Sequence, residues 1–163
     1  MKKKDLAEVL TDVRIARNKI KLWNSRIGNK ILQYQKLSTA NATRYSILAE
    51  QYAKESEQLE KITSYLDKLD ILLEMLEIKI ETIISVGHIV NDAPKIVEAL
   101  KIFKNITPSL SSEFSLMIDN ISSNFYSSIE IPQDIKIKAT QEAQAILDEA
   151  DSILNQKNIK VKA

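Results

Sequence analysis

The sequence is poor in the residues on which β-rich folds and nucleotide-binding sites depend. Its 163 residues include two glycines, three prolines, one histidine and no cysteine. A β-rich fold of this length needs a tight turn about every dozen residues, usually built with Gly, Asn-Gly or Pro. A P-loop or dinucleotide site needs clustered glycines, whereas Gly28 and Gly87 stand alone. These absences exclude both classes and predict an all-α fold.

The lack of cysteine and the scarcity of histidine also restrict the chemistry. Disulfides, thiolate zinc sites and cysteine nucleophiles are excluded, and His88 alone cannot form a two-histidine metal motif. Carboxylate pairs occur at helical spacing, such as Glu74 with Glu77, but charged residues are expected on the solvated face of a helix. We therefore predict that the protein is not an enzyme, with no catalytic, cofactor-binding or metal-binding residues.

Long apolar runs are missing as well. No stretch approaches the ~18–20 consecutive apolar residues of a membrane-spanning helix. The N-terminal lysines lead into an amphipathic stretch, and not into the apolar segment of a signal peptide. We therefore expect a cytoplasmic protein.

Charge is distributed unevenly along the chain, although the net charge is only +1. Up to Arg44 there are 11 basic residues and three acidic ones, and from residue 45 onward 12 basic residues oppose 19 acidic ones. This asymmetry indicates either an anionic partner for the basic segment or association between the two parts. A lysine-rich helix suits an anionic membrane or nucleic-acid phosphates. We favour lipid, because only Trp23 and Tyr34 offer rings on which single strands could stack.

The spacing of apolar residues predicts a single domain of five helices. They are expected at residues 5–38, 44–89, 94–106, 109–130 and 133–156, the first basic and the last acidic. A polar break between the first two suits a turn joining antiparallel helices, and prolines separate the later ones. The predicted architecture is a long antiparallel two-helix hairpin followed by three shorter helices.

The clearest pattern is a heptad repeat in the second helix. From Tyr45 onward, apolar residues alternate at spacings of three and four, with Glu55 as the one interruption. A sustained repeat of this kind predicts that the helix packs along a seam against a partner helix. The central seam residues are Leu59, Ile62, Leu66, Leu69, Leu73, Leu76 and Ile80.

This order of elements resembles the core of the ESCRT-III family. The resemblance rests on a basic first helix, a polar turn, a longer second helix containing Tyr52-Ala53-Lys54-Glu55, two short helices and an acidic fifth helix. The cysteine-free, Ile- and Lys-rich chain is similar to the archaeal Cdv cell-division (CdvB-like) branch. The resemblance covers about residues 5–156.

The resemblance implies a non-catalytic protein that polymerises into filaments on membranes and constricts or severs membrane necks in cell division or vesicle budding. Its implied partners are further copies, paralogous ESCRT-III subunits and an acidic membrane surface, at the inner face of the cell membrane and the division site. The implied membrane or polymer face comprises Arg14, Arg17, Lys19, Lys21, Arg26 and Lys30. The implied autoinhibitory residues of the acidic helix, which would mask assembly, are Asp148, Glu149 and Asp151.

One feature of the family is missing. ESCRT-III tails carry a leucine/arginine helix or a proline-rich strand that recruits an AAA ATPase, but no arginine or proline follows Gln133. We therefore expect recruitment of the ATPase to be indirect, through paralogues. The alternative interpretation is a soluble coiled-coil adaptor that dimerises and docks a protein partner. A nucleic-acid-binding helical protein is a third, disfavoured interpretation.

Overall fold

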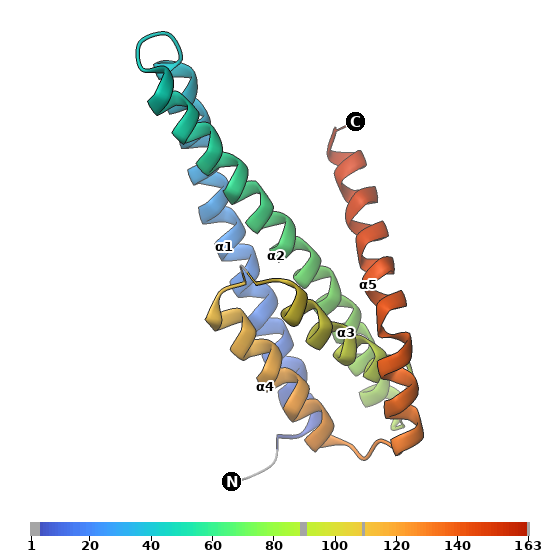
Figure 1. The fold of residues 1–163 in the computed structure, drawn as a ribbon. Helices are drawn as coiled ribbons and strands as arrows, with labels where there is room; N and C mark the ends of the chain where they lie inside the picture. The colour runs from blue at the N-terminus through green and yellow to red at the C-terminus, as the bar shows by residue number, and fades with distance from the viewer. Residues whose placement is uncertain (1–3, 89–90, 109, 163) are drawn as a thin grey trace. The chain divides into compact units, whose positions relative to one another are not determined.

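The computed structural model describes residues 4–88, 91–108 and 110–162, and these form five α-helices and no strand (Figure 1). The helices are α1 (Leu6–Asn41), α2 (Ser46–Val86), α3 (Asp92–Ile106), α4 (Ser112–Ser128) and α5 (Gln133–Lys162). The predicted all-α class is confirmed. The last helix continues to Lys162 instead of ending at Gln156, and the predicted boundaries at Ile89 and Ser109 lie outside the described residues.

Local residues account for several helix ends. Gly87 has a φ of +83°, a left-handed conformation that glycine adopts without a Cβ clash, and its N–H donates to the Ile83 carbonyl oxygen at 2.8 Å. This ends α2. At the start of α4 the Ser111 hydroxyl oxygen accepts from the Phe114 N–H at 3.4 Å, which caps the helix. Pro94 occupies the first turn of α3, where its missing N–H costs nothing.

The helices form two compact units. We call Met1–Asn18 together with Lys68–Ala163 the bundle unit, and Lys19–Asp67 the hairpin unit. Both α1 and α2 contribute residues to each unit.

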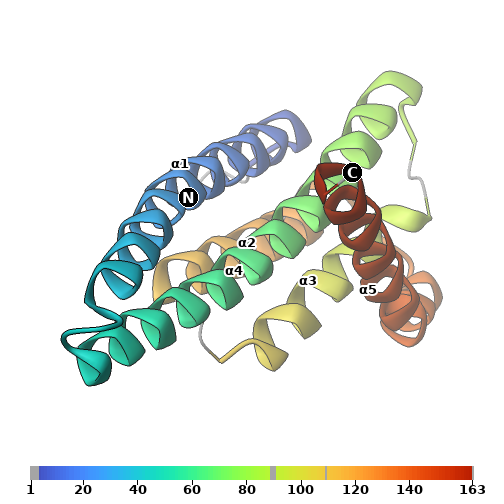
Figure 2. The ribbon, with the colours of Figure 1, turned by 90° about the horizontal axis from the view of Figure 1, so that it is seen from above.

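In the bundle unit, α3 lies between α4 and α5 and contacts both (Figures 1 and 2). Its apolar face is fully buried, with Leu100 and Phe103 at 0% and 1% exposure. Phe125 of α4 and Leu76 of α2 are equally buried. A core of this kind forms because each helix has an apolar face that must be removed from water.

In the α2 segment of the bundle unit, residues outside the predicted seam are buried as well. Leu69, Leu73, Leu76 and Ile80 of the seam are buried, but so are Ile71 and Leu72 outside it. The reason is that α2 meets α1 on one side, whereas elsewhere its Lys68 contacts both α3 and α5. A helix covered on several sides needs apolar residues beyond a single heptad stripe.

The hairpin unit is an antiparallel pair formed by parts of α1 and α2. The Ser38 hydroxyl donates to the Ala49 carbonyl oxygen at 2.9 Å, and the rings of Tyr34 and Tyr52 lie 5.7 Å apart. Contacts move forward along α2 as they move backward along α1, so the two helices run in opposite directions.

The seam of the hairpin unit differs from the predicted one near the turn. Ala49 and Ser56 are buried, whereas Tyr45 and Leu48 are 54% and 44% exposed, so extending the heptad pattern back to Tyr45 was wrong. At Ala49 the seam carries a small side chain, and the Ala49 carbonyl oxygen is within reach of the Ser38 hydroxyl of α1. Further along, Leu66 is buried, and Leu59 and Ile62 are half-buried.

Candidate functional site

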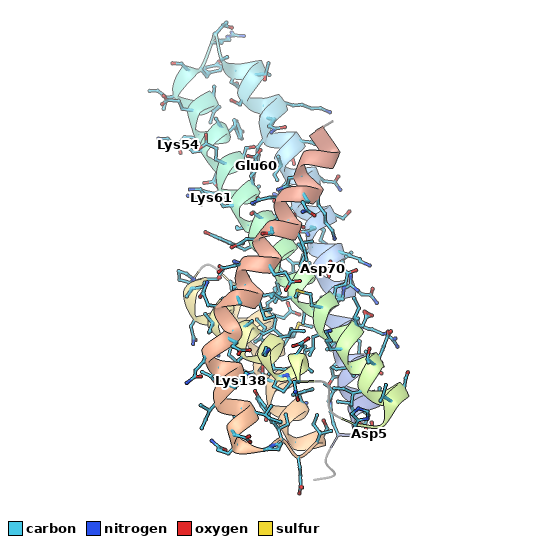
Figure 3. The ribbon with its side chains drawn as sticks, turned by 90° about the vertical axis from the view of Figure 1, so that its right-hand side faces the viewer. Asp5, Lys54, Glu60, Lys61, Asp70 and Lys138 are labelled. Carbon is cyan, nitrogen blue, oxygen red and sulfur yellow. The ribbon has the colours of Figure 1, made fainter. Side chains whose placement is uncertain are left out.

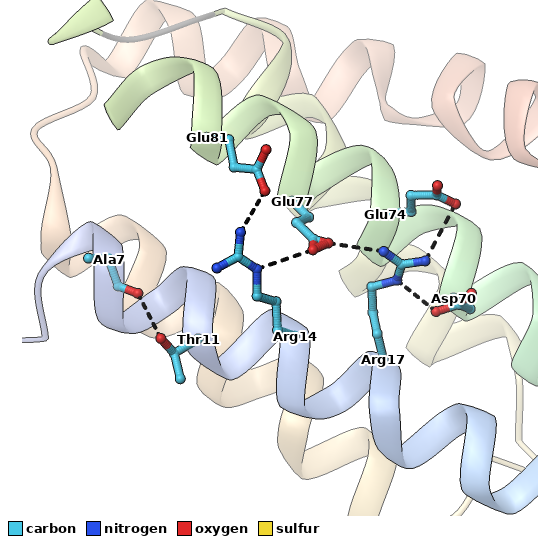
Figure 4. A network of polar contacts seen from close by, with 8 residues as sticks. All are labelled: Ala7, Thr11, Arg14, Arg17, Asp70, Glu74, Glu77 and Glu81. Atoms are coloured by element: carbon cyan, nitrogen blue, oxygen red, sulfur yellow. Dashed lines mark hydrogen bonds and ion pairs between the residues drawn. The ribbon is translucent and has the colours of Figure 1, made fainter. Parts of the chain in front are cut away.

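Within the bundle unit, two arginines of α1 face four carboxylates of α2 (Figure 4). We call this group the arginine ladder; its members are Arg14, Arg17, Asp70, Glu74, Glu77 and Glu81. The acidic residues recur every three or four positions and therefore share one face of α2. The arginines, three positions apart on α1, face them across the helix interface.

Arg17 is the centre of the ladder. Its Nε lies 2.9 Å from Asp70 Oδ1, its Nη1 3.0 Å from Glu77 Oε2 and its Nη2 3.6 Å from Glu74 Oε2. Arg14 extends the ladder, with Nε 3.3 Å from Glu77 Oε1 and Nη2 2.7 Å from Glu81 Oε1. The planar guanidinium suits such multiple contacts better than an ammonium would.

Burial and ion pairing act in opposite directions on Arg17. Its side chain is only 18% exposed, and burial by itself lowers its pKa. The hydrogen bond to Asp70 and the neighbouring carboxylates outweigh burial, so the pKa of Arg17 is raised and the cation is retained. Glu77 is 15% exposed, so its predicted place on a solvated face was wrong: the two arginines cover it.

Ion pairs hold α5 against two other helices of the bundle unit. Lys68 Nζ of α2 lies 2.8 Å from Asp151 Oδ1, and Lys95 Nζ of α3 lies 2.5 Å from Glu142 Oε2. The hydrogen bond from Lys95 is the largest influence on Glu142 and lowers the pKa of its carboxyl group, and the same bond raises the pKa of Lys95. Both partners of this pair are therefore ionised at neutral pH.

A further contact joins α5 to the arginine ladder. Lys157 Nζ lies 3.9 Å from Glu74 Oε2, the same oxygen that Arg17 contacts. Lys157 is 57% exposed, so this pair is accessible to water and salt. The ladder thus touches α1, α2 and α5 within one unit.

A buried carboxylate joins α3 to α4 and α5. Glu98 of α3 is 7% exposed and accepts hydrogen bonds from the Tyr126 hydroxyl at 2.6 Å and the Thr140 hydroxyl at 3.2 Å. Its Oε2 lies 3.4 Å from Lys101 Nζ. Burial, together with Glu98, raises the pKa of Tyr126, so the phenol stays a neutral donor. We did not predict this group, although an acid inside the run Ile96–Leu100 is the signal of a paired carboxylate.

The most deeply buried side chains of α5 are mainly small. Its buried residues include Ala139, Ala143 and Ala150, with Leu147 as the one large side chain among these four. A buried alanine methyl removes much less apolar area from water than a leucine does. Consequently, α5 depends on its ion pairs and hydrogen bonds more than a leucine-rich helix would.

The chain is similar in sequence to an archaeal cell-division protein. Neither a protein-family model nor a solved structure matches the chain. It is 36% identical over 157 residues to cell division protein B3 of Sulfolobus acidocaldarius, which covers 94% of this chain and 92% of that protein. The chain belongs to the archaeal CdvB-like branch of the ESCRT-III family. This relationship supports a role in archaeal cell division.

The ESCRT-III resemblance implied a basic face of six residues. In the structure, two of them belong to the bundle unit and four to the hairpin unit. Arg14 and Arg17 belong to the arginine ladder and contact α2, and of these two Arg14 is the more exposed, at 51%. The other four lie in the hairpin unit.

The basic residues of the hairpin unit lie on more than one side of it. Lys19, Arg26 and Lys30 follow a spacing that places them on one face of α1, whereas Lys21, two positions from Lys19, lies about 200° around the helix. Lys21, Arg26 and Lys30 are exposed. On α2, Lys54 and Lys61 are exposed and point to the same side (Figure 3).

The three acidic residues implied as autoinhibitory differ in their contacts. Asp151 pairs with Lys68 of α2. Asp148 accepts a hydrogen bond from the Gln144 amide within α5 at 3.1 Å. Glu149 lines a cleft with Lys79 and Lys95. The sequence did not predict the roles of Glu142 and Lys157, because a helical pattern does not indicate which cation an acid will meet.

Two kinds of feature are absent from the described residues. Within residues 4–88, 91–108 and 110–162, no helix is both long enough and apolar enough to cross a membrane. No cluster of three or more metal-binding side chains occurs in the same ranges.

Proposed function

We propose that this ESCRT-III subunit is a non-catalytic membrane-remodelling protein. It assembles with further copies and with paralogous subunits into filaments at the inner face of the cell membrane, at the division site. These filaments constrict or sever membrane necks. An AAA ATPase acts on these filaments through the paralogous subunits.

The observation that carries the proposal is how α5 is held. Its most deeply buried side chains are three alanines and one leucine, and partly exposed ion pairs and the hydrogen bond from Thr140 to Glu98 join it to α2 and α3. Such a helix can open locally at lower cost than one packed through large apolar residues. A detachable α5 supports a subunit that exists in a masked state and an assembly-competent state.

The charge of α1 supports an anionic lipid surface as the partner. Eight basic residues and no acidic residue occur between residues 13 and 49. Lys21, Arg26 and Lys30 of this stretch are exposed. Each lysine or arginine near an anionic membrane contributes about 1 kcal/mol to binding.

Charge reversal on α5 of the full chain tests the proposal. Asp151→Lys places a second cation beside Lys68, which should weaken docking of α5 and promote assembly on vesicles that contain phosphatidylglycerol. The matched control is Asp148→Lys, which makes the same change of charge at an exposed position whose hydrogen bond lies within α5. Co-sedimentation and negative-stain imaging measure binding and filaments, and circular dichroism checks helicity.

The outcomes separate the parts of the proposal. More filaments for Asp151→Lys than for wild type and for Asp148→Lys would support masking by α5. Equal assembly of the three proteins would contradict masking. A wild-type protein and an Asp151→Lys variant that both ignore anionic vesicles would contradict the membrane function itself.

A further inference from the structure

Large apolar side chains at the start of α2, and at the residue that precedes it, are left exposed by the hairpin unit. Tyr45, Ile47 and Leu48 are 54%, 75% and 44% exposed, and Arg44 precedes them. We call these four residues the hairpin tip. A single exposed apolar residue is ordinary, but three within four positions form one patch, and such patches mark interaction sites.

The fold does not account for this patch. The seam between α1 and α2 passes through Ala49, and the ring of Tyr52 packs against Tyr34. Ile47 is two positions from Ala49, about 200° around the helix, and therefore faces away from the seam. Its 75% exposure agrees with that direction. The apolar character of the tip thus remains unexplained by packing among the described residues.

The surroundings of the tip are cationic. The acid-free stretch that begins at residue 13 extends to Ala49, and Glu50 is the first acidic residue after it. The Arg44 guanidinium carbon lies 5.7 Å from the centroid of the Tyr45 ring. On the last turns of α1, Lys36 lines a shallow groove with Leu32 and Thr39.

We infer that the hairpin tip is a membrane anchor for an anionic bilayer. Ile47 and Leu48 enter the boundary between headgroups and acyl chains, and Tyr45 stays at the level of the headgroups, where aromatic rings with a polar end accumulate. Arg44 reaches the lipid phosphates while its aliphatic stem lies along the apolar surface. The inference rests on the proposed function and specifies where the bilayer is entered.

Size and chemistry favour lipid over a protein partner. A stable protein interface uses roughly 20–30 residues on each side, whereas the hairpin tip has four. Insertion of a few apolar side chains, with cations at the rim, is sufficient for reversible attachment to an anionic membrane. The two modes of attachment also differ in salt: contacts of α1 cations weaken as ionic strength rises, and burial of Ile47 and Leu48 does not.

The first experiment removes the apolar side chains of the hairpin tip from the whole 163-residue chain. The variant Ile47→Ser with Leu48→Ser should bind phosphatidylglycerol vesicles at least about tenfold more weakly, with the larger part of the loss persisting at high salt. The matched control is Leu116→Ser with Ile137→Ser, which removes two side chains that are 61% and 51% exposed in the bundle unit. The control should bind as wild type does.

A fluorescence measurement reports insertion directly. In a Trp23→Phe background, Tyr45→Trp should shift its emission to the blue on vesicles and be quenched by brominated lipids. Tyr65→Trp in the same background, at a position 39% exposed on α2, should show neither effect. Thermal melting confirms that each variant is folded.

The other outcomes overturn the inference in distinguishable ways. If the tip variant binds vesicles like wild type while reversal of Lys21, Arg26 and Lys30 abolishes binding, the anchor is wrong and the proposed function stands. If the tip variant still binds vesicles but no longer assembles, the tip is a contact between copies of this chain, and the lipid inference fails. If wild type binds no anionic vesicle, both the inference and the proposed membrane function fail.

Discussion

Removal of the Arg17 guanidinium should destabilise the bundle unit far more than removal of the Arg14 guanidinium. Arg17→Ala leaves the carboxylates of Asp70 and Glu77, which are 20% and 15% exposed, without their shared cation. The two partly buried carboxylates then repel each other, with no cation between them. Arg14 is 51% exposed, so water can solvate its carboxylate partners when the guanidinium is removed, and the loss of stability is small.

The magnitude follows from the contacts of Arg17. It forms hydrogen bonds of 2.9 and 3.0 Å to two carboxylates and a longer contact of 3.6 Å to a third. A hydrogen bond to a charged group contributes about 1.5–3 kcal/mol, and breaking a fully buried ion pair costs about 3–5 kcal/mol. Because this group retains some access to water, we expect Arg17→Ala to lower the free energy of unfolding by about 2–3 kcal/mol.

Urea denaturation followed by circular dichroism measures this loss. A double-mutant cycle of Arg17→Met with Glu77→Gln isolates their interaction, and we expect a coupling free energy of about 1–2 kcal/mol. A loss for Arg17→Ala no larger than that for Arg14→Ala, or a coupling near zero, would show that the ladder does not hold α1 on α2.

Three further changes test other contacts of the bundle unit. The pKa of Glu142 is lowered, chiefly by its hydrogen bond with Lys95, so its contribution to stability is present at neutral pH and is lost as pH falls through the lowered folded value. Glu142→Gln should therefore reduce the loss of stability that wild type shows below about pH 4 in acid titrations followed by circular dichroism. Tyr126→Phe removes a 2.6 Å hydrogen bond from buried Glu98 and should cost about 1–2 kcal/mol in urea denaturation; no change would mean that water replaces the phenol. Leu76→Ala, at 0% exposure, should cost about 2–5 kcal/mol in the same assay, and a smaller loss would indicate that the core collapses around the cavity.

Local signals in the sequence were sufficient for the helices themselves. The scarcity of glycine and proline left few places to break a helix, and Pro94 and Pro132 lie at or beside helix starts. The second helix was predicted to continue to Ile89. Instead, the left-handed backbone of Gly87 ends α2 at Val86. The periodicity of apolar residues does not indicate which glycine will adopt a left-handed conformation and end a helix.

The candidate functional surfaces were less predictable. Asp151 was expected to act through its charge, and it does pair with Lys68, but Glu142 and Lys157 have comparable contacts that the charge pattern did not single out. In the hairpin unit, Leu48 fitted the heptad pattern as well as any residue and is nevertheless exposed. Spacing along a helix predicts which residues share a face, whereas the identity of the facing helix depends on contacts distant in sequence.

By itself, the sequence determined an all-α chain with a basic beginning and an acidic end, because helix propensity, proline position and charge act over a few neighbouring residues. Only the tertiary structure decided that Arg17 is enclosed by three carboxylates of α2, that Leu72 is buried beyond the seam, and that Ile47 is left exposed. Those outcomes depend on how closely helices approach one another. In the hairpin unit Ala49 and Ser56 are buried while their heptad neighbours Leu48 and Glu55 are exposed, and in the bundle unit α2 is packed on several sides.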